Sequence, residues 1–172
     1  MELKRITRLA LLLALSVVLN LVESIIPIFN GTVPGLKLGL ANIVILFTLY
    51  KFSFRESITL SIMRVILVGI LRTGLFSVSF FFSLGGAFLS IIIMYIFKKI
   101  TKLSIIGISI LGSIFHSIGQ IIVACLLINT TSMIYYLPWI LLFSIPTGIF
   151  TGIMSKQLLN AYDKIIVDEN RY

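Results

Sequence analysis

Apolar residues in this chain come in long runs with few polar positions, and short groups of charged, glycine or proline residues separate the runs. The runs are 17 to 25 residues long. An apolar helix needs about 20 residues to cross a hydrocarbon core of roughly 30 Å. The pattern therefore predicts six transmembrane helices, at residues 6–26, 36–52, 57–75, 77–97, 104–128 and 135–159.

Composition agrees with this pattern. Of the 172 residues, 59% are hydrophobic and only 12% are charged, and the mean hydropathy is +1.15. A soluble domain is about half apolar and a quarter charged. We expect an all-α, polytopic membrane protein in which residues 1–172 form a single six-helix transmembrane domain with short termini. The first apolar run is interpreted as a retained helix, because no small-x-small cleavage site follows it.

The charged residues predict an orientation. With six spans, eleven of the fourteen cations fall on one side of the membrane, and the opposite loops at 29–35, 73–79 and 129–134 hold none. The positive-inside rule then places both termini in the cytoplasm of a multi-pass protein of the cell membrane. The net charge of +8 is attributed to this asymmetry, and no nucleic-acid partner is expected. The eleven cations are Lys4, Arg5, Arg8, Lys51, Arg55, Lys98, Lys99, Lys102, Lys156, Lys164 and Arg171.

A second group of polar residues lies within or at the outer ends of the predicted helices. A charge at mid-membrane costs roughly 2.5–3.5 kcal/mol even on insertion scales, so such groups usually face a bundle interior or a cavity. Arg64 and Arg72 lie about two helical turns apart, and His116 and Gln120 share a helix face. The candidate substrate-binding residues are Glu23, Lys37, Asn42, Arg64, Arg72, His116 and Gln120.

These residues allow two interpretations. In the structural one, Lys37 and Arg72 extend to the outer interface, Glu23 pairs with one of them, and Arg64 clamps a neighbouring helix through backbone carbonyls. His116 is then a buried hydrogen-bonding residue. In the functional one, three cations against one carboxylate form a cavity suited to an anion.

Small residues recur at close-packing intervals in the last three predicted helices. Gly85 and Gly86 lie midway along the fourth, and Gly148 and Gly152 lie on the sixth. Such spacing allows membrane helices to approach closely. Helix packing is the default interpretation, and space for a ligand is the alternative.

The acidic residues argue against catalysis by this chain. Magnesium-dependent catalysis requires clustered carboxylates, because Mg²⁺ prefers hard oxygen ligands. The six acids are dispersed or terminal, without an Asp-Asp-x-x-Asp motif, and there is no P-loop, nucleophile elbow or paired-cysteine metal motif. We expect neither an enzyme nor a bound cofactor or metal.

Three blocks of sequence resemble a known membrane family. VPGLKLGLAN, MRVILVGILRTGLFSVSFFFSLGGAFLS and SIIGISILGSIFHSIGQIIVA are similar, in order and spacing, to heptaprenyl diphosphate synthase component I, also called the Gx transporter family. The resemblance covers residues 9–154. The family tends to have asparagine where this chain has Ser117.

That family in turn resembles the substrate-binding S components of energy-coupling factor (ECF) transporters. The resemblance implies a six-helix bundle that captures a small anionic or amphiphilic molecule, such as a prenyl phosphate or quinone precursor, from the outer side. It implies a transmembrane T component and ATPase subunits as partners, with Ala10 and Ala14 of an Ala-x-x-x-Ala pattern at the T-component contact. The alternatives are a noncatalytic membrane subunit associated with heptaprenyl diphosphate synthase, or a subunit of a membrane redox or assembly complex.

Overall fold

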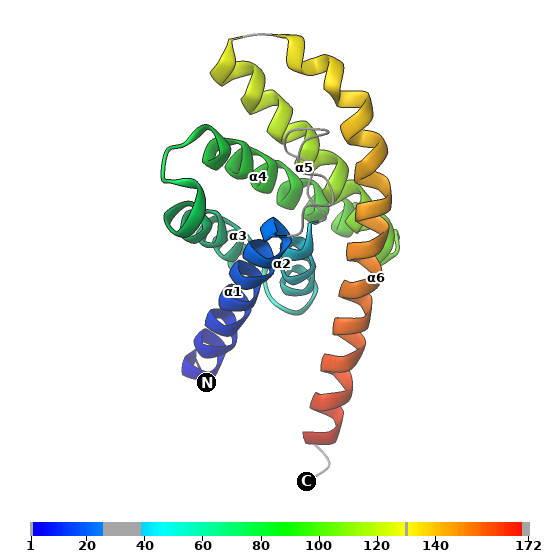
Figure 1. Cartoon of the computed structure of the whole chain (residues 1–172). Coiled ribbons are helices and arrows are strands. Elements are labelled where there is room, and N and C mark those ends of the chain that lie inside the picture. Colours follow the sequence, from blue (N-terminus) through cyan, green and yellow to red (C-terminus); the bar gives the residue numbers. More distant parts are fainter. Residues whose placement is uncertain (1, 26–38, 130, 170–172) are drawn as a thin grey trace.

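The computed structural model describes residues 2–25, 39–129 and 131–169, and these ranges form helices joined by short turns (Figure 1). No β-strand occurs within these ranges, so the predicted all-α class is confirmed. Each predicted apolar segment overlaps one α-helix. The elements are α1 (Glu2–Ile25), α2 (Leu40–Lys51), α3 (Phe54–Val68), the π-helical turn η2 (Gly69–Thr73), α4 (Val78–Ile100), α5 (Ile105–Ile128), the 3₁₀ turn η3 (Thr131–Tyr136) and α6 (Leu137–Glu169).

Four helices in the described part are long and apolar enough to cross a membrane: α1, α4, α5 and α6. The sequence predicted six spans. α2 has 12 residues, a rise of only about 18 Å, and the first three residues of its predicted segment lie outside the described part. The third segment is divided, because α3 ends at Val68 and the chain continues as the π-helical turn.

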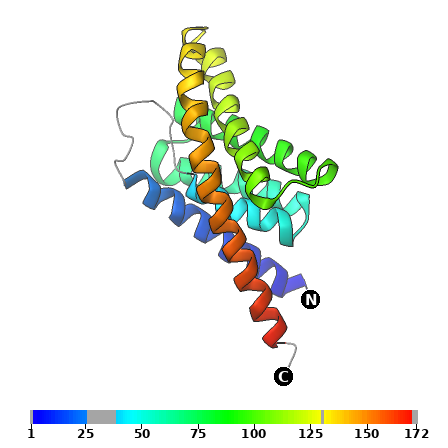
Figure 2. The same ribbon diagram turned by 90° about the vertical axis from the view of Figure 1, so that its right-hand side faces the viewer.

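The helices lie in a continuous series of neighbours. α4 packs along α5, α5 packs along α6, and α1 contacts both α2 and α3. α2 also contacts α6, which joins the first and second halves of the chain. Figures 1 and 2 show α6 running the length of the molecule, with the N-terminus and the C-terminus at the same end.

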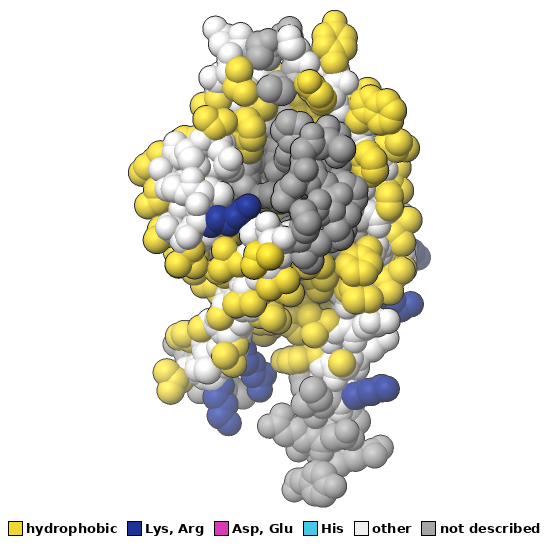
Figure 3. Space-filling view, viewed as in Figure 1, with side chains coloured by type: hydrophobic (Ala, Val, Ile, Leu, Met, Phe, Trp, Pro, Cys, Tyr) yellow, Lys and Arg dark blue, Asp and Glu magenta, His cyan; other side chains and the backbone are white. Residues whose placement is uncertain are grey.

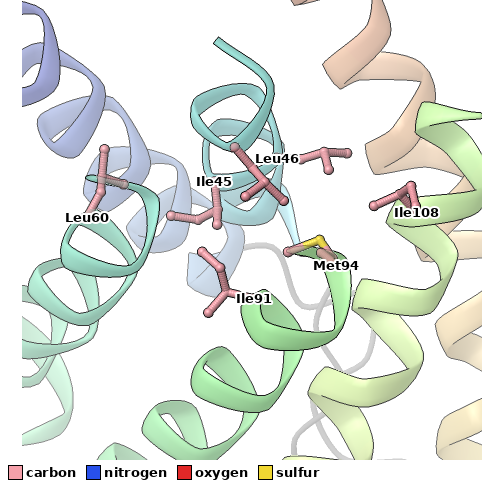
Figure 4. Close-up of a cluster of buried hydrophobic side chains, with 7 residues drawn as sticks. Ile45, Leu46, Leu60, Ile91, Met94 and Ile108 are labelled. Carbon is pink, nitrogen blue, oxygen red and sulfur yellow. The ribbon is translucent and has the colours of Figure 1, made fainter. Parts of the chain in front are cut away.

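An apolar cluster fills the space between α2, α3, α4 and α5 (Figure 4). Ile45 and Leu46 enter it from α2, and Ile91 enters it from α4 with no exposed surface. Because both sides of the short helix α2 are covered, it is the most enclosed helix of the bundle in the described residues. The cluster holds α2 and α3 against each other, and with them the polar residues that these helices carry.

Serine side chains define the first turns of three helices. The hydroxyls of Ser53, Ser77 and Ser104 accept hydrogen bonds from backbone N–H groups of α3, α4 and α5. At Ser53 the Glu56 carboxylate also accepts the N-cap N–H, which completes a capping box. Between η2 and α4 the chain turns back at Gly74, whose φ of 83° favours glycine, within the predicted loop at 73–79.

Candidate functional site

Glycines bring the backbones of α4 and α5 unusually close. A Cβ atom on Gly119 would lie 2.6 Å from the carbonyl oxygen of Gly85. A Cβ atom on Gly86 would lie 2.8 Å from the carbonyl oxygen of His116 and 2.9 Å from Cγ of Gln120. Real Cβ atoms do not approach other atoms this closely, so packing explains these glycines. The same contact holds His116 and Gln120 of α5 against α4.

Hydroxyl groups connect α5 to α6. The Ser117 and Ser144 hydroxyls lie 2.6 Å apart, and those of Ser109 and Thr151 lie 2.8 Å apart. All four side chains are buried. Hydrogen bonds between hydroxyls satisfy polar groups that would otherwise be costly in an apolar bundle. These contacts place a polar strip along the inner side of the α5–α6 pair.

Glu23 of α1 caps the next helix. Its Oε1 accepts a hydrogen bond of 2.6 Å from the N–H of Gly39, and its Oε2 accepts one of 3.2 Å from the N–H of Leu40. Gly39 is the N-cap of α2 and has no side chain to do this. A carboxylate also interacts favourably with the positive end of the helix dipole. The structural role of Glu23 is therefore a cap formed across two helices.

Arg64 is a buried cation near the C-terminal end of α3. Only 4% of its surface is exposed, and its Nη1 donates a 3.2 Å hydrogen bond to Oδ1 of Asn42 on α2. Its Nε has no hydrogen-bond partner among the residues that the structure describes. Glu23 is the carboxylate that acts electrostatically on it. A guanidinium with five donors is thus held in place with hydrogen-bonding capacity left over.

These groups surround one pocket, and all six α-helices contribute to its wall. Its enclosed volume is about 50 Å³, which is space for a small polar group rather than for a whole drug-sized ligand at roughly 300–1,000 Å³. The lining is formed by Asn20, Glu23, Gly39, Ala41, Asn42, Arg64, Ser83, Ser113, His116, Ser117, Gln120, Ile140, Phe143, Ser144 and Thr147.

Five of the seven residues predicted to bind substrate line this pocket, and two do not. Lys37 lies outside the described residues. Arg72 is exposed near the end of the π-helical turn and is not part of the lining, so the structure does not bring it together with Arg64 at this pocket. Residues that project in a similar direction from a helix need not lie at a similar depth, because eight residues span about 12 Å along the axis. The five are Glu23, Asn42, Arg64, His116 and Gln120.

Sequence analysis missed the hydroxyl side of the pocket. Ser83, Ser113 and Thr147 line it, as do Ser117 and Ser144. Serine and threonine satisfy themselves on the preceding helical turn, as Ser144 does by donating to the Ile140 carbonyl, so they cost little in any apolar helix. The available signal was the position of Ser117 beside His116, in the block that carries the family resemblance.

The remaining sequence predictions concern metal ligands and the Ala-x-x-x-Ala pattern of α1. Among the described residues no three His, Cys, Asp or Glu side chains gather where a metal ion could be held. Ala10 and Ala14 are both exposed on α1. Ala10 also lines an apolar groove of about 340 Å³ between α1 and α3, with Leu9 and Met63 among its walls.

The fold and the composition together define the class: an all-helical, multi-pass membrane protein with a buried polar pocket at the centre of its bundle. The chain belongs to the family described as heptaprenyl diphosphate synthase component I, which matches residues 12–158. This confirms the family resemblance seen in the sequence. No curated protein and no solved structure matched the chain.

Proposed function

We propose that this protein is the substrate-binding membrane component of an ECF-type transporter and that its central pocket captures an anionic group. The observation that carries the proposal is Arg64, which is 4% exposed and retains an unpaired Nε–H among the described residues. Burying an incompletely paired guanidinium is expensive, and such residues inside membranes usually serve a ligand or an ion pathway. A clamp onto Asn42 uses only part of its donor capacity.

The pocket supports a particular class of ligand. A guanidinium recognises carboxylate and phosphate through two parallel N–H groups. The hydroxyl of Ser113 lies in the same lining and can add a neutral donor, whereas the hydroxyls of Ser117 and Thr147 already donate to backbone carbonyls of their own helices. Because the enclosed space is about 50 Å³, we infer that the pocket holds a small anion or the anionic end of an amphiphile, such as a prenyl phosphate or a quinone precursor.

We further propose that α2 and α3 complete a six-span, S-component-like bundle with both termini in the cytoplasm. Both termini lie at one end of the molecule, as an even number of crossings requires (Figure 1). The arrangement of cations in the sequence supports the orientation. Exposed Ala10 and Ala14, beside the apolar groove, suit close contact with a T component that ATPase subunits drive.

A second candidate function is a noncatalytic membrane subunit of heptaprenyl diphosphate synthase. The family description is the observation that favours it. This role would use an outer surface of the bundle for a protein partner and would leave the central pocket without a ligand. Because the acids of this chain are dispersed, the synthase subunit would carry out the catalysis in this role.

The deciding experiment measures binding of farnesyl phosphate and of inorganic phosphate by the full chain in a mild non-ionic detergent. Arg64→Gln should weaken binding roughly tenfold to a hundredfold, because hydrogen bonds to charged groups contribute about 1.5–3 kcal/mol. Arg72→Gln is the matched control, since it removes the same charge from the exposed end of the same helical run. It should leave binding within about twofold of the unchanged protein.

Native mass spectrometry of the same preparations separates the two candidates. A co-purifying anion that Arg64→Gln loses and Arg72→Gln keeps supports the transport role. A pocket that binds neither probe, in a protein that holds a synthase subunit tightly, overturns it in favour of the second candidate. Equal binding by Arg64→Gln and the unchanged protein would leave Arg64 as a helix clamp.

A further inference from the structure

A second hollow lies at the end of the molecule where both termini are found. Three segments that are distant in the sequence form it: the first turns of α1, the turn between α2 and α3, and the C-terminal half of α6. Its volume is about 550 Å³, within the usual range for ligand pockets of roughly 300–1,000 Å³. We call it the basal hollow. Four cations line it: Lys4, Arg5, Arg8 and Lys51.

Two of these cations form ion pairs with carboxylates of the same chain. Arg5 donates two hydrogen bonds to the Glu56 carboxylate, at 2.5 and 2.8 Å, and Lys51 pairs with Asp163. No such ion pair joins Lys4 or Arg8 to an acid within the described residues. The hollow therefore carries an excess of about two positive charges, contributed by adjacent turns of α1.

The contacts around the basal hollow hold its walls together. The Arg5–Glu56 pair ties α1 to α3, and the Lys51–Asp163 pair ties α2 to α6. Arg8 donates a 3.4 Å hydrogen bond to the hydroxyl of Tyr162 on α6. The Tyr162 ring in turn packs edge-on against Phe47 of α2, with centroids 5.2 Å apart. Arg8 is thus oriented before a ligand arrives, which reduces the entropy lost on binding.

This arrangement differs from the ordinary distribution of cations on a membrane protein. Lys and Arg side chains gather near the N-terminal end of α1 and along the lower half of α6, below the apolar surface (Figure 3). Lys99 and Lys102 are also exposed, but they line no part of the basal hollow. A general attraction to an anionic surface would treat all these cations alike. A built site would depend on the ones that line it.

We propose that the basal hollow binds a phosphate-bearing anion, separately from the central pocket. A phosphate oxygen can accept hydrogen bonds from the Arg8 guanidinium and the Lys4 ammonium together. The phosphate can come from a lipid headgroup at the membrane surface or from a soluble diphosphate. Basic pockets between membrane helices recognise both by the same chemistry.

The test uses the full chain and two probes. Inorganic pyrophosphate is titrated into the protein in a neutral detergent by calorimetry. Retention of phosphatidylglycerol is measured by native mass spectrometry after release from nanodiscs of phosphatidylcholine with or without phosphatidylglycerol. The variants are Lys4→Gln and the pair Lys4→Gln/Arg8→Gln. The matched control, Lys99→Gln/Lys102→Gln, removes the same charge outside the hollow.

Replacing both Lys4 and Arg8 should weaken binding of the responding probe roughly tenfold or more, since each cation beside a phosphate contributes to the electrostatic part of the affinity. The control pair should change it less than about threefold. Lys4→Gln alone should show an intermediate loss, and its exposed side chain makes no contact whose removal would unfold α1.

Pyrophosphate binding identifies a soluble source, and selective lipid retention identifies a headgroup. Equal loss in both pairs, or binding of neither probe, overturns the proposal whether or not the central pocket binds its anion.

Discussion

The two halves of the bundle are held together by different kinds of contact. In the second half, α4, α5 and α6 meet through glycines at backbone distance and through buried hydroxyl pairs such as Ser117–Ser144. In the first half, α1, α2 and α3 meet through long side chains, with Glu23 capping α2 and Arg5 paired to Glu56. Backbone contact leaves no room for adjustment, whereas side-chain contacts can change their rotamers.

This difference explains how the central pocket is composed. The closely packed half provides neutral donors and acceptors at fixed positions, among them His116, Gln120 and Ser117. The adjustable half provides the charged groups, Glu23 and Arg64. A polar site between the halves can therefore combine a rigid wall with groups that respond to a ligand.

Gly119→Ala should have the largest effect, because it breaks the contact between α4 and α5. The added methyl would lie 2.6 Å from the Gly85 carbonyl oxygen, and backbone cannot move aside as a side chain can. We expect a loss of about 1–3 kcal/mol in the free energy of unfolding, or failure to fold. Guanidinium unfolding in detergent, followed by circular dichroism, measures it.

Gly107→Ala on the same helix is the matched control. Its nearest atom, Cβ of Leu103, would lie at an ordinary 3.5 Å. Alanine is favoured over glycine in a helix by up to about 1 kcal/mol, so this variant should be as stable as the unchanged protein or slightly more stable. Equal stabilities for the two variants would contradict the backbone contact.

Glu23→Ala tests the first half, where we expect a smaller effect. The change leaves the N–H groups of Gly39 and Leu40 without their acceptor. A lost cap costs about 1–2 kcal/mol, so thermal unfolding should begin at a lower temperature. Glu23→Gln keeps one acceptor oxygen and should lose about half as much. A Gln variant no more stable than the Ala variant would argue against the cap.

The Arg5–Glu56 pair should give the smallest effect and a pH dependence. Hydrogen bonds from Arg5 lower the pKa of Glu56 from 4.5 to about 2. A lowered carboxyl pKa stabilises the folded state above pH 4.5, and this contribution is lost as the pH falls towards 2. Because Arg5 is largely exposed, we expect about 1 kcal/mol or less.

Glu56→Gln is the comparison, because glutamine preserves the capping box while it removes the charge. The unchanged protein should unfold at a slightly higher temperature than this variant near neutral pH. The difference should shrink between pH 4.5 and pH 2. A difference that stays constant over that range would show that the ion pair does not stabilise the fold.

The sequence alone predicted the helices well because long apolar runs leave few alternatives. α4 and α5 begin within one residue of their predicted starts, after Ser77 and Ser104. The prediction was poorer for α2 and α3, where charged and glycine residues interrupt the runs and the helices are short. For the central pocket, the sequence indicated Arg64 and His116, which line it, and Arg72, which does not, because periodicity gives direction around a helix and not depth along it.

Hydropathy determined the helical class and the apolar, membrane-spanning character of the helices, since both depend on local chemistry summed along the chain. Tertiary structure decided which polar groups meet. It placed Ser113, Ser117, Ser144 and Thr147 in one pocket with Arg64, and it placed Lys4 and Arg8 in one hollow with Tyr162, which is distant in the sequence. The reason is physical: the partners of a buried polar group are set by how helices cross, and helix crossings depend on contacts between residues far apart in the sequence.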